Sequence, residues 1–351
     1  MRPNDPKRSK FALHGPAIEI ACEVPEMAEQ VTRLFEPFAV QRWPEGFMPT
    51  VGIIRPYTQA EVLRHLSPGA HPVPGVPADV MEVYEDGDRF WLVDDRWGMA
   101  EINLIRGQFR SWIVPNCRLD PVRIAETAIV WPLAQLLRAK GLYLLPAVSV
   151  VRDGWAVMIV CPFTLEAELV AMIRAGYKVI GQRWTCLREE DGRLALLHLP
   201  GMIERSFVPR LRAASAEGNA GGTSDRAWVD LSNEYLGSWQ NHAFCDAVLI
   251  ADGGRRGTSR LRDVAPEGAL DTLRQSWPLV ELHPQRRHSH LPMKLAQHTR
   301  VCELQLSRSP AELLDLLATL RITPFGKLPD QNDTEATTPW AGLRPVPGIA
   351  A

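Results

Sequence analysis

Hydrophobic residues recur along the start of the chain with two different periods. Residues 17–24 (AIEIACEV) and 50–57 (TVGIIRPY) are short, mostly apolar runs, which predict buried strands. Between them, residues 25–38 (PEMAEQVTRLFEPF) have the apolar spacing of an amphipathic helix, and Pro25 stands at its first position, where proline is favoured. A strand–helix–strand order is therefore expected after residue 14.

Residues 80–114 follow a different rule, because apolar and polar residues alternate there. Two turn signals, Asp86-Gly87 and Arg106-Gly107, interrupt the alternation. Alternation of period two between such turns predicts an antiparallel meander. With the preceding elements, this defines an α/β N-terminal domain over residues 14–118.

The second half of the chain combines helices with tight hairpins. Residues 120–142 have a helical pattern, and Pro132 inside it predicts two helical pieces, since proline cannot continue an α-helix. Asp153-Gly154 and Asp191-Gly192 each join two strand-like runs and predict hairpins. The fold class expected for the whole chain is α/β, with a mixed β core and packed helices in the second half.

These patterns divide the chain into four parts. The polar start, residues 1–13, is expected to be a flexible arm, and residues 14–118 form the first domain. A second domain is expected over residues 119–325. The remaining residues, 326–351, are rich in proline and show no periodicity, so they are expected to be a disordered tail.

One segment, residues 157–187, has a frame that often carries a phosphate-binding loop: a buried strand, a turn, a helix and a second strand. Its turn, Cys161 to Thr164, contains neither glycine nor lysine. Pro162 removes a backbone N–H donor, and Phe163 fills space that an anion would need. Thr164 is expected to cap the helix with its hydroxyl, and Glu166 and Glu168 follow in the first turn, where carboxylates favour the helix dipole.

Residues 136–160 (LLRAKGLYLLPAVSVVRDGWAVMIV) and 169–180 (LVAMIRAGYKVI) resemble the HPr serine kinase/phosphorylase family. This resemblance covers roughly the last 190 ordered residues and is strongest for the shorter kinase-related members. It implies a core shared with the PEP carboxykinases. It also implies hexamers for full-length members, although no residue of this chain fixes an interface.

The functional residues that the resemblance implies are absent from this chain. Where the family has a glycine-rich loop ending in Gly-Lys-Ser/Thr, the chain has the turn from Cys161 to Thr164. Where the family has paired acidic residues, the chain has Gln182 and Arg183. An arginine at that position repels magnesium, and no carboxylate pair nearby offers it oxygen ligands. No nucleotide cofactor is therefore expected.

Residues 283–300 (HPQRRHSHLPMKLAQHTR) contain four histidines, three arginines and one lysine, and no acidic residue. A solvated basic face is one interpretation, and a site for an anion or a partner is the other. The residues that would bind are Arg286, Arg287, His288 and His290. A metal site is not favoured, because metal needs three or four converging ligands with supporting carboxylates.

Two further candidates have simple structural alternatives. Arg255 and Arg256 (within GGRRGTSRLR, residues 253–262) would grip an anion, or they would lie on a polar hairpin at a sheet edge. Cys161 precedes a helix, where thiolates are stabilised, but its apolar neighbours favour a buried core cysteine.

Composition narrows the class of protein further. The net charge of −2 gives no general attraction to nucleic acid or membranes, and no apolar run is long enough to span a bilayer. The six cysteines form no CxxC pair, so a reduced, cytoplasmic protein is expected. Eleven tryptophans, including Trp91, Trp97 and Trp112, favour a protein-binding role, since tryptophan is enriched at interfaces.

The function expected from these observations is that of a catalytically inactive kinase-like protein, a scaffold that binds another protein or a peptide. Two alternatives stay open. One is an enzyme of altered chemistry that binds a nucleotide or another anion through Arg183, Arg255 or the basic run. The other is a structural subunit of a larger complex, and a homo-oligomer is also open.

Overall fold

The structure is a computed structural model of the 351-residue chain. It describes residues 6–42, 49–56, 65–73, 81–94, 96–114, 124, 126–161, 165–199, 202–204, 228–230, 235, 237–255, 257–265, 268–271, 273 and 290–323. The proline-rich segment 326–351 and residues 283–289 of the basic run lie outside these residues.

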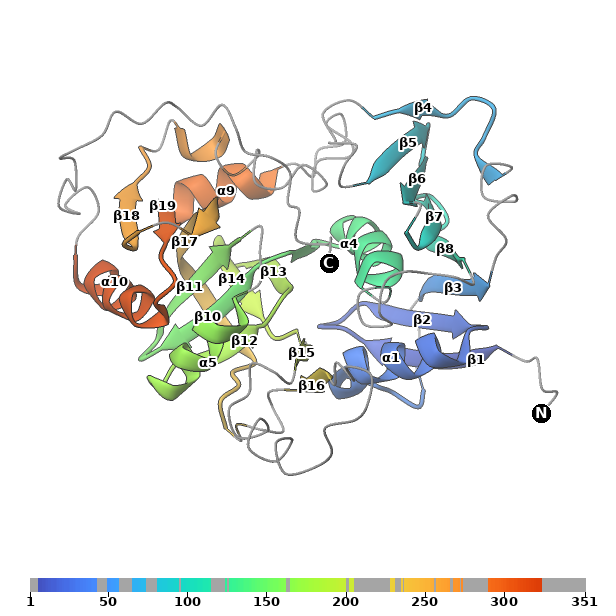
Figure 1. Ribbon diagram of the computed structural model, residues 1–351. Coiled ribbons are helices and arrows are strands. Elements are labelled where there is room, and N and C mark those ends of the chain that lie inside the picture. Colours follow the sequence, from blue (N-terminus) through green and yellow to red (C-terminus); the bar gives the residue numbers. More distant parts are fainter. Residues whose placement is uncertain are drawn as a thin grey trace. The chain divides into compact units, whose positions relative to one another are not determined.

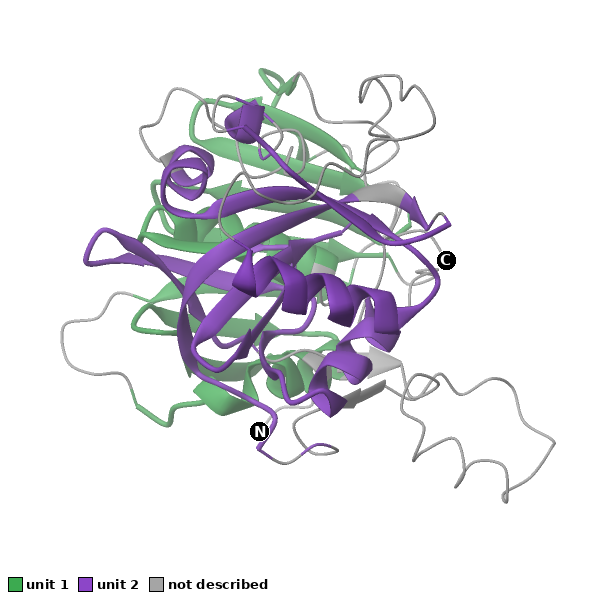
Figure 2. Cartoon of the chain, turned by 90° about the vertical axis from the view of Figure 1, so that its left-hand side faces the viewer, with its two compact units in different colours: residues 1–144, 278–282 green, residues 145–277, 283–351 purple. Residues whose placement is uncertain are grey.

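The chain forms two compact units, coloured separately in Figure 2. Unit 1 contains residues 1–144 and 278–282, and unit 2 contains residues 145–277 and 283–351. Each unit is built on its own mixed sheet with helices packed on it, as the strand and helix labels in Figure 1 show. The α/β fold class predicted from the sequence is confirmed, whereas the domain boundary near residue 118 stays a prediction.

Unit 1 contains a sheet of eight strands among the described residues, in the order β1-β2-β3-β8-β7-β6-β5-β4. Strands β2 and β3 are parallel, β3 and β8 are parallel, and the remaining neighbours are antiparallel. The strands are β1 (Lys7–Ala12), β2 (Ala17–Cys22), β3 (Thr50–Pro56), β4 (His71–Pro72), β5 (Glu82–Asp86), β6 (Arg89–Asp94), β7 (Gly98–Asn103) and β8 (Gln108–Ile113).

The predicted meander is confirmed as strands β5 to β8. Its turns contain Gly87 and Gly107, both with φ of +60°, a conformation that glycine adopts without steric cost. Trp91, Trp97 and Trp112 lie in this region and are buried, with exposed fractions of 1%, 0% and 6%. They stabilise unit 1 from inside, so they do not support the protein-binding role expected from the tryptophan count.

The flexible arm expected over residues 1–13 is wrong for residues 7–12, which form β1. This strand pairs with β2 along its whole length. Phe11 is only 1% exposed and packs against Phe35 of the neighbouring helix at a ring-centroid distance of 5.2 Å. One buried aromatic residue anchors an otherwise polar edge strand, and the local composition of the strand does not reveal that contact.

Helices of unit 1 are α1 (Pro25–Phe35), a 3-10 turn (Glu36–Phe38), a π-helical turn (Glu126–Val130) and α4 (Trp131–Arg138). Figure 1 shows α1 alongside β1 and β2, which it contacts. Pro25 occupies the start of α1 as expected. Pro132 lies in the first turn of α4, directly after the π-helical turn, which confirms two helical pieces.

Among its described residues, unit 2 is built on a sheet of nine strands with the path β12-β10-β11-β17-β14-β13-β9, and β19 joins β17 to the outer strand β18. A separate pair, β15 and β16, lies outside this sheet. The strands are β9 (Leu142–Leu145), β10 (Val148–Arg152), β11 (Trp155–Val160), β12 (Lys178–Gly181), β13 (Thr185–Glu190), β14 (Arg193–Leu197), β15 (Met202–Glu204), β16 (Trp228–Asp230), β17 (His242–Arg255), β18 (Arg260–Asp263) and β19 (Arg300–Leu306).

Both hairpins predicted in the second half are confirmed. Asp153 and Gly154 turn β10 into β11, and Asp191 and Gly192 turn β13 into β14. All four residues have positive φ, between +49° and +79°. That pairing of an aspartate with a glycine is typical of the two-residue turns that match the twist of the strands.

Three helices of unit 2 are α5 (Glu166–Arg174), α9 (His290–His298) and α10 (Pro310–Ile322). Helices α5 and α10 contact each other and share one hydrophobic core with the sheet. Leu169 and Met172 of α5, and Leu313 and Leu317 of α10, are at most 1% exposed in that core. Four cysteines behave as buried residues as expected: Cys22, Cys186, Cys245 and Cys302.

The hairpin interpretation of residues 253–262 is wrong, because β19 lies between β17 and β18. Strand β17 is parallel to β19, and β18 is antiparallel to it. Residues far along the chain therefore supply the middle strand. The expected position at a sheet edge is correct, since β18 pairs only with β19 among the described strands.

Arg300 connects three elements at the end of α10. Its Nε and Nη2 atoms donate to the two carboxylate oxygens of Asp263 on β18, at 2.6 and 2.7 Å. Its Nη1 donates to the carbonyl oxygens of Leu320 and Thr323 at the C-terminal end of α10. Both charged side chains are about one-eighth exposed, and the fork geometry is the strong form of this ion pair.

We expect Arg300→Leu to lower the free energy of unfolding by about 3 kcal/mol, since it removes the ion-pair partner of a mostly buried aspartate. Chemical denaturation monitored by tryptophan fluorescence measures the change. Arg262→Leu is the matched control, because its ion pair with Glu303 is exposed on the arginine side and contributes less than about 1 kcal/mol. Equal losses for the two variants would contradict the special role of Arg300.

Candidate functional site

The candidate site lies at the edge of the unit 2 sheet where its parallel strands end. Strands β11, β17 and β19 run in the same direction. Strand β12 joins them, because it is antiparallel to β10 and β10 is antiparallel to β11. The carboxyl ends of parallel strands are where α/β proteins bind their ligands. This edge therefore collects the residues that follow each strand.

Helix α5 is the next described helix after β11 along the chain. Its N-cap is Leu165, with no side-chain capping bond. Thr164, which was predicted to cap this helix, lies outside the described residues, so its role stays a prediction. Glu166 and Glu168 do lie in the first turn, as predicted, but both are buried, with exposed fractions of 5% and 1%. Two buried carboxylates at a helix start need partners, because burying a charge alone is costly.

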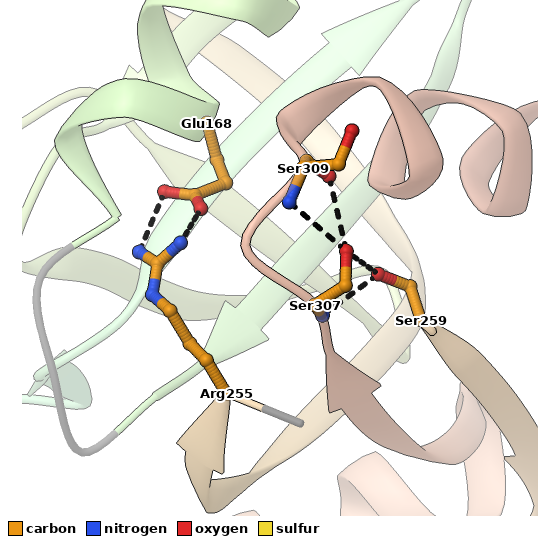
Figure 3. Close-up of polar contacts among 5 residues, drawn as sticks. All are labelled: Glu168, Arg255, Ser259, Ser307 and Ser309. Carbon is orange, nitrogen blue, oxygen red and sulfur yellow. Dashed lines mark hydrogen bonds and ion pairs between the residues drawn. The ribbon is translucent and has the colours of Figure 1, made fainter. Parts of the chain in front are cut away.

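Arg255 is the partner of Glu168, as Figure 3 shows. Its Nη1 donates to Oε1 of the glutamate, and its Nη2 donates to Oε2 at 3.1 Å. The glutamate side chain is 1% exposed and the arginine side chain 29%. A guanidinium thus binds a carboxylate with two parallel bonds, and removing one partner of such a pair destabilises a fold by about 3–5 kcal/mol.

An irregularity in β17 brings Arg255 to this position. The pairing of β17 with β19 shifts between Ala251↔Leu304 and Arg255↔Leu306. Three residues of β17 (252–254) therefore face one residue of β19, position 305. Bulges of this kind bend a strand and re-aim a side chain. Here the shift places the arginine at the end of β17, in reach of α5.

A group of three serines lies at the end of β19, shown beside the ion pair in Figure 3. The hydroxyl groups of Ser259 and Ser307 are 3.0 Å apart. The backbone N–H of Ser307 donates to the Ser259 hydroxyl at 2.9 Å, and that of Ser309 donates to the Ser307 hydroxyl at 3.0 Å. Ser259 and Ser307 are buried, so these bonds satisfy polar groups inside the protein.

Glu312 joins this serine group to helix α10. The helix begins with Ser309 as N-cap and Pro310 in its first turn, as the sequence indicates. The Glu312 carboxylate accepts the backbone N–H of Ser259 at 2.6 Å. This hydrogen bond holds the pKa of Glu312 below its ordinary value. The contact ties β18 to α10, so the glutamate serves a distant strand.

Gln182 and Arg183 follow β12 at the same edge. Gln182 is 2% exposed, and neither atom of its amide has a hydrogen-bond partner in the described part of the chain. Arg183 is half-buried. The preceding Gly181 is tightly enclosed, since an added Cβ would lie 2.5 Å from the Trp184 carbonyl oxygen and 2.7 Å from the Thr185 hydroxyl. The tight packing around Gly181 therefore fixes the backbone position from which Gln182 and Arg183 extend.

The structure brings together only some of the residues expected to form a site. Cys161 is half-buried and packs against the hydrophobic core of unit 2. Arg255 is close to α5, but its partner there was not expected. His290 begins α9, and its side chain lies outside the described residues. The other predicted residues also lie outside them: Pro162, Phe163, Thr164, Arg256, Arg286, Arg287 and His288.

Neither a metal-binding cluster nor a membrane-spanning helix is found in the described residues. No group of three His, Cys, Asp or Glu side chains in them is arranged to hold a metal ion. No helix in the described part of the chain has the length and apolar character needed to cross a membrane.

No protein-family model matches the chain, and no curated protein matches it either. Among solved structures, the chain is similar to the Hpr(Ser) kinase/phosphatase from Coxiella burnetii, with a TM-score of 0.31 and 12% identity. The similarity covers 51% of this chain and 95% of that protein. This similarity is weak.

Gln182→Met is expected to raise the free energy of unfolding by about 1–3 kcal/mol, because it replaces a buried amide without partners by an apolar side chain of similar length. Gln240→Met is the matched control. Its amide donates to the His242 carbonyl oxygen at 2.9 Å, so its replacement should lower stability. Urea denaturation of both variants measures the two signs. A loss for Gln182→Met would contradict an unsatisfied amide.

Glu312→Gln should be less stable than the wild type at pH 7. Because its pKa is depressed in the folded protein, the carboxylate stabilises the fold above the unfolded pKa of about 4.3. That contribution is lost as the pH falls through the lower, folded pKa. The stability difference should therefore shrink on acidification, as measured by thermal unfolding from pH 7 to pH 3.

Asp315→Asn is the control for this experiment, since its carboxylate lies on the same helix and makes no hydrogen bond among the described residues. Its stability should differ little from that of the wild type at any pH in the series. A Glu312→Gln deficit that is constant from pH 7 to pH 3 would contradict the role of the charged carboxylate.

Proposed function

We propose that this chain is a kinase-like protein without phosphoryl-transfer activity that acts as a scaffold for another protein or a peptide. The observation that carries the proposal is the ion pair between Glu168 and Arg255. It occupies the first turn of α5, at the edge where parallel strands end. The protein's own carboxylate thus stands where an enzyme of this architecture would receive the anionic part of a nucleotide.

Electrostatics opposes a nucleotide at this edge. A phosphate near Glu168 would meet a like charge, and two unit charges about 4 Å apart near a protein surface repel by roughly 4 kcal/mol. The arginine that would offset this repulsion already binds the glutamate. The turn before α5 has no lysine and no glycine in its sequence, from Cys161 to Thr164. These residues favour a closed helix start over a phosphate loop.

Magnesium-dependent chemistry has equally little support from the residues after β12. Magnesium is bound through carboxylate oxygens and phosphates. This chain has Gln182 and Arg183 at the position where the resembled family has paired acidic residues. An amide and a guanidinium supply neither the charge nor the ligands.

The binding role rests on the kind of substrate that such kinases take. The family that the sequence resembles implies recognition of a protein substrate beside the phosphate loop. A protein that loses the phosphate site while it keeps a surface for a protein partner becomes a scaffold. We place this scaffold in the cytoplasm, as expected from its dispersed, mostly buried cysteines.

Calorimetric titration with ATP, ADP and pyrophosphate, each with and without magnesium, tests the proposal. We expect neither binding heat nor a thermal shift at millimolar ligand. Affinity purification from the source cells should then recover a stoichiometric protein partner. Micromolar nucleotide binding would overturn the proposal and favour an enzyme of altered chemistry. Arg183→Ala would then show whether that arginine holds the ligand.

A further inference from the structure

In the ion pair between Glu168 and Arg255, the guanidinium binds the carboxylate as an anion site binds a free oxyanion. Both guanidinium nitrogens that face the glutamate donate to it, one to each carboxylate oxygen. This parallel arrangement is how arginine recognises free carboxylates and phosphates. The carboxylate belongs to the protein, but its contacts are those of an oxyanion.

Burial distinguishes this pair from an ordinary surface salt bridge. The carboxylate is 1% exposed, so it is enclosed on the side of the helix. The arginine is 29% exposed, so its other side reaches solvent. By contrast, the exposed pair of Arg33 and Glu29 in unit 1 has more than half of each side chain in solvent. Solvent thus reaches the pair through Arg255.

The shift in β17 shows that the arginine is placed here by the backbone. Three residues, 252–254, face a single position of β19, and the arginine directly follows them. An interruption of a strand in the sheet core costs ladder hydrogen bonds. The contact with Glu168 is the feature that this interruption produces, since it carries Arg255 to the first turn of α5.

We infer that Arg255 forms an oxyanion site and that Glu168 is its tethered occupant. A tethered group has an effective concentration of at least about a millimolar, so a free anion of ordinary affinity does not displace it. Once the carboxylate is removed, the same arginine accepts a small free oxyanion such as phosphate or acetate. The inference concerns the edge described under the proposed function, but it does not depend on the scaffold role.

Chemical rescue of Glu168→Ala tests this inference. The variant should melt at a lower temperature than the wild type in sodium chloride, because it removes the two-bond ion pair between Arg255 and the carboxylate. Sodium phosphate at equal ionic strength should restore the melting temperature, by about 3 °C for each tenfold rise above the dissociation constant. Acetate should act in the same direction, because it replaces the missing carboxylate.

The double variant Glu168→Ala/Arg255→Met is the control, since phosphate also stabilises proteins in a general way. The wild type and the double variant should show only that general effect, which is then subtracted. An equal response of the single and double variants would overturn the inference. So would a single variant that responds to chloride as strongly as to phosphate.

A second measurement covers a single variant that does not fold in chloride. Refolding from urea in phosphate should then recover soluble protein for Glu168→Ala, and no recovery would overturn the inference. The wild-type titration with nucleotides decides the proposed function separately. Rescue of the variant beside nucleotide binding by the wild type would keep the oxyanion site and reject the inactive scaffold.

Discussion

The fork between Glu168 and Arg255 is the contact on which the architecture of the sheet edge depends. It joins the first turn of α5 to the end of β17, where the pairing of β17 with β19 shifts just before the arginine. A buried carboxylate cannot stay charged without such a partner. The buried glutamate therefore depends on the arginine that follows the bulge in β17.

Two helices, α5 and α10, follow parallel strands at this edge. In each, an acidic residue of the first turn binds a group from a distant part of the chain. A helix start presents N–H donors and a positive dipole, which in many proteins receive a phosphate. In α5 the carboxylate of Glu168 binds Arg255. In α10 Glu312 accepts the backbone N–H of Ser259, which directly precedes β18. Both acidic residues serve distant strands. The edge is thus stabilised by internal contacts between the helix starts and distant strands.

Much of the fold follows from local patterns in the sequence. The meander, the two Asp-Gly hairpins and the break at Pro132 were predictable, because turn chemistry and period act over a few residues. The middle strand β19 was not, since it lies about forty residues beyond the strand it separates from β17. The ion pair was missed for the same reason. Glu168 has a sufficient local role at the helix start, and Arg255 lies 87 positions away.

The tie between α5 and β17 also has a consequence for how the protein folds. Arg255 reaches Glu168 only after β17 has paired with β11 on one side and with β19 on the other. Both pairings close long stretches of chain, so we expect the fork to form late, after the sheet has assembled. A contact absent from the transition state affects the unfolding rate alone. Loss of the ion pair should therefore raise the unfolding rate and leave the folding rate nearly unchanged. The lifetime of the folded state thus depends on this contact.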